Sequence, residues 1–156
     1  MKNLIRFITI VFATITLSAL LAHLMELPGK IYLSKENYQT VQQIYRGWAW
    51  LGILEIGAIL LTLVWAIMER KKPIFSFLLI AFLLFNSSLV IFFIYIFPAN
   101  NITLNWTQLP ANWEKLRKQW EYSHAVRTFL NFAGFCLLII ALLKDKNNSR
   151  KKENGI

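Results

Sequence analysis

The chain has little of three kinds of side chain: cysteine, histidine and acidic residues. Its 156 residues include one cysteine, two histidines and eight acidic residues, against 17 lysines and arginines. Because Cys136 is alone, the chain forms no disulfide framework and no redox thiol pair of its own. Any site that uses imidazole must be built from His23 and His124. No internal repeat is visible either, which disfavours a transporter.

Apolar residues, in contrast, make up 56% of the chain. They concentrate in four runs, Leu4–Met25, Trp48–Met68, Ile74–Phe97 and Ala125–Leu143. Each approaches or exceeds the roughly 18 to 20 residues that a helix needs to cross a bilayer. We therefore expect an all-α membrane protein, with a four-helix transmembrane bundle in residues 1–144 and a basic, disordered cytoplasmic tail in residues 145–156. A cleaved signal peptide is the alternative for the first run, but its apolar length exceeds that of a signal core.

The net charge of +9 would suit a nucleic-acid partner, but topology explains it better. If the helices alternate in direction, more basic residues fall on one side, including the turn Arg70-Lys71-Lys72. This bias predicts that both termini lie in the cytoplasm. The expected location is a bacterial inner membrane, with the chain as an integral protein. The expected partners are the lipid bilayer and a small hydrophobic molecule, not nucleic acid, and the oligomeric state is left open.

Short interfacial helices are expected in the two outer loops. In the first loop, Tyr38, Val41 and Tyr45 share a helical face after a possible Ser34 cap. This segment is interpreted either as a lid over the helix ends or as a substrate-binding tyrosine cluster. The preceding Leu27-Pro28-Gly29 predicts the end of the first helix, because proline breaks the hydrogen-bond ladder.

Small and polar residues within the spans predict how the helices pack. Thr9, Thr16 and His23 recur every seven residues, so they should form one stripe that faces other helices. Asn86 should hydrogen-bond to a neighbouring helix. Close helix approach is expected at two glycines, Gly52 and Gly57.

Ionisable residues gather near the outer ends of three spans. Glu121 and His124 share a helical face, and His23 and Glu26 repeat that spacing in reverse. Imidazole and carboxylate groups are ligands of zinc, iron and manganese. A tentative metal site therefore comprises His23, Glu26, Glu55, Glu121 and His124. The cofactor is otherwise unknown: a divalent transition metal is the candidate, and haem is less favoured. Alternatively, the carboxylates pair with Arg46, Arg117 or Arg127 as structural ion pairs.

Several of these residues lie in short motifs. They are His23-Leu24-Met25-Glu26-Leu27-Pro28, Gly47-Trp48, Pro98-Ala99-Asn100, Trp113-Glu114-Lys115-Leu116-Arg117 and Trp120-Glu121-Tyr122-Ser123-His124-Ala125-Val126-Arg127. With them, nearly the whole chain resembles the small four-span membrane proteins grouped with the anthrone oxygenases, long labelled a domain of unknown function. The last block resembles that family's Trp-x-x-Leu-Arg followed by Trp-Glu-x-x-His-Ala.

This resemblance implies a four-helix membrane bundle, in which some family members oxidise an anthrone to an anthraquinone with molecular oxygen. The positions that carry over from the family are His23, Asn100, Arg117, Trp120, Glu121, His124 and Arg127. The leading hypothesis is an oxygenase-like or other redox enzyme that acts on a small hydrophobic or aromatic molecule at an outer pocket. Its expected catalytic residues are His124, His23, Glu121, Arg117 and Arg127, and its expected substrate-binding residues are Asn100, Trp120 and Asn131.

Within that hypothesis, the histidines bind a metal or act as general base, and the arginines stabilise an enolate or phenolate. The alternative hypothesis is a non-enzymatic membrane binding or accessory protein, whose polar cluster is an ion-pair latch that closes the bundle.

Overall fold

Four long helices dominate the computed structural model, which describes the backbone of residues 1–153 and the side chains of residues 1–145. Within the described chain every regular element is a helix. The segments Lys2–Lys30, Trp48–Met68, Phe75–Ile102 and Trp113–Asp145 are each long and apolar enough to cross a membrane. These findings confirm the prediction of an integral membrane protein with a helical bundle.

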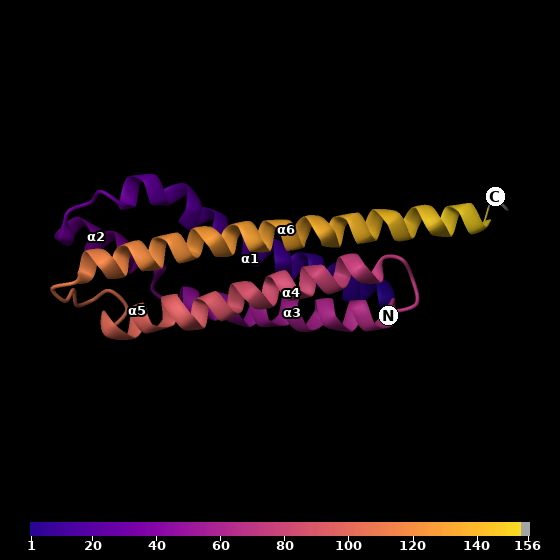
Figure 1. The fold of residues 1–156 in the computed structure, drawn as a ribbon, viewed down its shortest axis with the longest axis horizontal. Helices are drawn as coiled ribbons and strands as arrows, with labels where there is room; N and C mark the ends of the chain where they lie inside the picture. The colour runs from indigo at the N-terminus through magenta and orange to yellow at the C-terminus, as the bar shows by residue number, and fades with distance from the viewer. Residues whose placement is uncertain (154–156) are drawn as a thin grey trace.

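The long helices form a closed ring of neighbours (Figure 1). Helix α1 (Lys2–Lys30) contacts α3 (Leu51–Met68) and α6 (Trp113–Glu153), and α4 (Phe75–Ile91) contacts the same two helices. The N-terminus and the α3–α4 turn lie at one end of the bundle, which we call the turn end. The opposite end, called the cap end, carries the short helices α2 (Lys35–Gln42) and α5 (Phe97–Ile102).

The first helix continues two residues beyond Pro28 and ends at Lys30. The expectation that Leu27-Pro28-Gly29 ends it was therefore wrong. Proline removes one backbone donor but does not prevent the next turn from closing, and the Ile31 N–H still donates to the Leu27 carbonyl at 3.0 Å. The extra residues keep Lys30 on the face that carries His23, seven positions earlier.

The third membrane-spanning segment contains one wider helical turn just before Pro98. A π-helical turn, η3 (Phe92–Ile96), joins α4 to α5 and brings the Phe97 N–H to the Phe92 carbonyl. Pro98, at the start of α5, has no N–H to donate into the ladder. We attribute the wider turn to this missing donor, since π-turns typically relieve such local interruptions. The interhelical bond predicted for Asn86 is absent, because its Nδ2 donates to the Phe82 carbonyl of its own helix at 3.1 Å.

The first loop folds as a series of short helical segments. Ser34 caps α2 by accepting a hydrogen bond from the Asn37 N–H. The 3-10 turns η1 (Gln43–Tyr45) and η2 (Trp48–Trp50) follow, and Gly47 between them has a φ of 89°, a left-handed conformation that favours glycine. In the second loop, residues 103–112 form turns and no separate helix.

Packing inside the bundle follows the predicted polar stripe. Thr9, Thr16 and His23 are all buried. A Cβ at Gly57 would lie 2.7 Å from the Phe12 ring, so this glycine does permit close approach, whereas Gly52 faces open space.

Helix α6 continues to Glu153 and extends past the other helices at the turn end (Figure 1). The expected tail, residues 145–156, lies almost wholly outside the described side chains, and residues 154–156 lie outside the described backbone. A disordered cytoplasmic tail stays a prediction.

Candidate functional site

Two imidazoles face each other at the cap end. His23 comes from α1 and His124 from α6, and their ring centroids are 4.1 Å apart with the planes 31° from parallel. The Trp120 ring lies 5.0 Å from His23 and 4.2 Å from His124. Tyr45 and Trp48 also pack against His23, at 4.4 Å and 5.4 Å. We call these five residues the histidine cluster.

Each histidine has only 6% of its surface exposed, and the Nδ1 atom of each ring is buried without a hydrogen-bond partner. Buried polar nitrogens are nearly always partnered, and an unpartnered one costs about 1–3 kcal/mol. Each such exception calls for an explanation, and a catalytic role or a bound ion is one of them. Two unpartnered basic nitrogens enclosed by aromatic rings therefore form the candidate binding site.

Lys30 makes several polar contacts beside this cluster. Its Nζ lies 3.2 Å from Glu121 Oε1 and 3.4 Å from Glu26 Oε2. It also donates to the Tyr45 hydroxyl at 2.6 Å, and the Tyr45 O–H in turn donates to Glu26. One ammonium group is thus shared by two carboxylates and one phenol.

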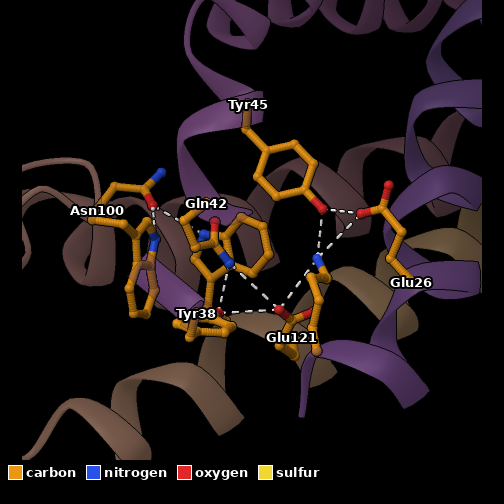
Figure 2. Close-up of polar contacts among 9 residues, drawn as sticks. Glu26, Tyr38, Gln42, Tyr45, Asn100 and Glu121 are labelled. Atoms are coloured by element: carbon orange, nitrogen blue, oxygen red, sulfur yellow. Dashed lines mark hydrogen bonds and ion pairs between the residues drawn. The ribbon is translucent and has the colours of Figure 1, made fainter. Parts of the chain in front are cut away.

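Glu121 binds α2 as well as α1. The Tyr38 O–H donates to Glu121 Oε1 at 3.0 Å, and Gln42 Nε2 donates to the Tyr38 hydroxyl at 2.6 Å (Figure 2). Tyr38 and Gln42 are four residues apart on α2, so one helical face presents both side chains. The carboxylate of α6 therefore holds the first loop down over the bundle, while its own Oε2 is buried without a partner.

Burial raises the pKa of Tyr38 and of Tyr45 in this loop. For Tyr38, the nearby Glu121 carboxylate adds to the effect of burial and raises the pKa further. For Tyr45, burial is again the main cause of the raised pKa, followed by the hydrogen bond to Glu26. Both phenols therefore stay protonated at neutral pH and act as hydrogen-bond donors to carboxylates.

Asn100, on α5, holds two indoles in place. Its Oδ1 accepts hydrogen bonds from Trp106 Nε1 at 3.1 Å and from Trp120 Nε1 at 2.9 Å. Because Trp120 contacts both imidazoles, this amide fixes one wall of the histidine cluster. Asn100 was predicted to bind substrate, but here its carbonyl is occupied by the protein.

The second loop is tied to the first by two glutamine side chains. Gln43 Nε2 donates to the Trp106 carbonyl at 3.0 Å, and Gln39 Nε2 donates to the Thr107 carbonyl. Residues 31–50 and 103–112 consequently form one unit over the histidine cluster, which we call the cap. The lid interpretation of the first loop fits this arrangement.

The cap contains strained backbone. Leu104, Asn105 and Trp106 have φ values of 47°, 55° and 64°, in the left-handed region. Such residues cost on the order of 1–3 kcal/mol each and persist where their surroundings hold them. Trp106 is buried, and its N–H donates to Thr103 Oγ1 at 3.0 Å, so it anchors this turn.

Arg117 of α6 contacts the cap rather than the imidazoles. Its NH1 donates to the Leu33 carbonyl at 2.7 Å. Its guanidinium lies over the rings of Trp113, at 4.6 Å, and Tyr38, at 5.4 Å. Through these contacts, Arg117 joins α6 to the first loop.

A second polar network lies deeper in the bundle. Arg127 NH2 lies 2.6 Å from Glu55 Oε2, which joins α6 to α3. Ser88 of α4 donates to Glu55 Oε1 at 3.2 Å and accepts from Asn131 Nδ2 at 2.7 Å. All four residues are buried. The network thus links three helices through satisfied polar groups.

The structure therefore divides the predicted site into three parts. His23, Trp120, Glu121 and His124 come together, with Glu26 beside them. Glu55, Arg127 and Asn131 lie in the deeper network, and Arg117 joins α6 to the cap. The division follows helix geometry, since Arg127 is almost one turn further along α6 than His124.

The five residues of the tentative metal site do not converge. Among the described residues, no group of three or more His, Cys, Asp or Glu side chains is arranged to hold a metal ion. Glu55 pairs with Arg127, and the ammonium group of Lys30 lies between Glu26 and Glu121. The imidazoles contact each other directly, so no haem fits between them in this arrangement.

Sequence reasoning missed Lys30 as a member of the site. A signal was present, because Lys30 follows Glu26 by four residues and His23 by seven. The predicted helix end at Leu27-Pro28-Gly29 instead placed Lys30 in the first loop. Ser88 was not predicted either: it lies two residues after Asn86 and so on a different helical face.

Comparisons with protein-family models, with curated proteins and with solved structures gave no match for this chain.

Proposed function

We propose that this membrane protein binds a small, flat hydrophobic molecule at the histidine cluster and oxidises it with molecular oxygen. The observation that carries the proposal is the contact between two buried imidazoles, 4.1 Å apart, whose Nδ1 atoms have no partner. Aromatic walls favour a planar ligand that can stack on them. The resemblance to the anthrone oxygenase group supports a tricyclic ketone such as anthrone as the substrate class.

In this proposal, one imidazole accepts a proton from the ring CH2 group of the ketone. The resulting negative charge is shared with the carbonyl oxygen and is stabilised by Lys30, which lies 5.1 Å from the Trp120 ring. Addition of O2 and loss of water then convert CH2 to C=O, so carbon is oxidised and oxygen is reduced without another reductant. Lys30 takes the anion-stabilising role that was expected of Arg117 and Arg127.

Access to the cluster is proposed beside Trp48. This residue is partly buried, packs against His23 and directly follows Gly47. The rings of the cluster fill its centre, so a ligand must displace one of them. Movement of η2 about the left-handed Gly47 would do this without breaking the contacts of Lys30 with Glu121.

The test measures thermal stability and oxygen consumption of the purified protein in detergent, with anthrone and related tricyclic ketones. We expect stabilisation by ligand and oxygen uptake, both lost in His124→Gln and His23→Gln and both retained in Thr16→Ala, a buried control on the same face of α1. Stabilisation without oxygen uptake would leave a binding protein and refute the oxidation step. Absence of both effects would refute the proposal.

A second candidate function is favoured by the deeper network. Its charges and hydrogen bonds are satisfied within the protein, as a structural latch requires. If the whole polar set serves only to close the bundle, Glu121→Asp and Arg127→Lys should change thermal stability while no small molecule does. Ligand-dependent stabilisation that requires His124 would contradict this second candidate.

We also propose that the turn end faces the cytoplasm of a bacterial inner membrane, as the cationic turn suggests. In a Cys136→Ser background, a cysteine at position 118 should react with a membrane-impermeant maleimide in intact cells. A cysteine at position 71 should react only after the membrane is opened. The opposite labelling pattern would reverse the orientation without affecting the proposed chemistry.

A further inference from the structure

Charged side chains from three parts of the chain meet at the turn end. Arg6 of α1 donates to Glu69 and to Asp145, each at 2.7 Å. Lys72 lies 2.9 Å from Glu69 and 2.7 Å from Asp145. Burial disfavours the charge of Glu69, but hydrogen bonds from Lys72 and Arg6 outweigh burial and lower the pKa of Glu69. This carboxylate is therefore ionised and already neutralised.

Arg70 and Lys71 take no part in that network. Both are exposed, and among the described residues neither makes a side-chain hydrogen bond or an ion pair. They line a hollow of about 420 Å³ together with Lys2, Ile67, Met68 and the already paired Glu69 and Lys72. The hollow therefore combines unpaired cations with apolar side chains, of which Ile67 is 51% exposed.

The position of the hollow relative to the membrane indicates which kind of ligand it can bind. It lies where α3 leaves its membrane-spanning segment, which ends at Met68. Cations at that level meet lipid phosphates, and an apolar side chain directly beneath them meets the acyl chain. Arg6 and Lys72 already neutralise Glu69 and Asp145, and Lys2 lies 3.8 Å from Glu69 as a further cation. Together with Arg70 and Lys71 it leaves a surplus of positive charge. A zwitterionic lipid would only partly balance that surplus.

We propose that this hollow binds the phosphate headgroup of an anionic phospholipid, with the acyl chain against Ile67. Arg70 and Lys71 provide most of the charge, and Lys2 lines the hollow beside them. The site is independent of the histidine cluster and of any reaction there. It requires only that the bundle spans a bilayer.

The experiment compares the protein in nanodiscs of phosphatidylcholine with nanodiscs that also contain phosphatidylglycerol. Thermal unfolding and native mass spectrometry report stabilisation and the number of retained lipids. We expect phosphatidylglycerol to raise the unfolding temperature and to be retained. In Arg70→Gln/Lys71→Gln, its apparent affinity should fall roughly fivefold for each charge removed.

The matched control is Lys115→Gln/Lys118→Gln, which removes two exposed lysines at the cap end. It should behave like the wild type in both lipids. Equal losses in the two double variants would show a diffuse charge effect and overturn the site. Equal stabilisation by inorganic phosphate in phosphatidylcholine would show a general anion site and overturn the lipid assignment. No preference for phosphatidylglycerol in the wild type would also overturn it.

Discussion

Removal of the Lys30 ammonium group should destabilise the bundle by about 3–5 kcal/mol, because it leaves a buried carboxylate without its cation. The side chains of Lys30 and Glu121 are 4% and 0% exposed. Glu26, the other carboxylate near Lys30, is 37% exposed and can be hydrated once the cation is lost. The loss of stability in Lys30→Met therefore arises mainly at Glu121, whose remaining hydrogen-bond donors, Tyr38 and Gln42, are uncharged.

A second substitution separates this charge effect from lost packing. In Lys30→Met/Glu121→Gln no carboxylate is buried without a partner, so about 2 kcal/mol or more of the stability should return. Reversible unfolding in detergent measures both variants against Lys35→Met, which replaces an exposed lysine and should change stability by less than about 0.5 kcal/mol. The reasoning is refuted if Lys30→Met behaves like Lys35→Met, or if the double variant is no more stable than the single one.

Three further predictions concern packing and pH. Gly57→Ala should cost about 1–3 kcal/mol, because its Cβ would lie 2.7 Å from the Phe12 ring, whereas Gly52→Ala should be neutral or stabilising in the same unfolding assay. The lowered pKa of Glu69 stabilises the folded state above about pH 4.5, so stability should fall as pH drops below that value, and less steeply in Glu69→Gln. The raised pKa of Tyr38 has the opposite sign: stability should fall as pH rises above about 10, with a smaller loss in Tyr38→Phe, which denaturant titrations at several pH values would measure.

The four spans could be predicted because apolar runs of this length have few alternative structures. The meeting of His23 with His124 could also be predicted, since alternating helices bring both to one end. What could not be predicted is the depth along the bundle at which long side chains from different helices meet. Arg127 reaches Glu55 below the imidazoles, and sequence spacing alone does not fix the relative rotation of two helices.

The cap was harder to predict than the bundle. Its shape depends on contacts between two loops that lie far apart in the sequence, such as that of Gln43 with the Trp106 carbonyl. Glutamine side chains bonded to backbone carbonyls leave no periodic pattern. The left-handed turn at Leu104 is equally hard to predict from the sequence, because non-glycine residues seldom adopt that conformation.

The last helix supplies a partner to every charged network described above: Glu121 for Lys30, Arg127 for Glu55 and Asp145 for Arg6. During synthesis, the first three spans therefore enter the bilayer while Glu55 still lacks its cation. A buried carboxylate in that state is costly and marks an incomplete chain. Insertion of α6 is then the step that supplies this cation and closes the ring of four helices.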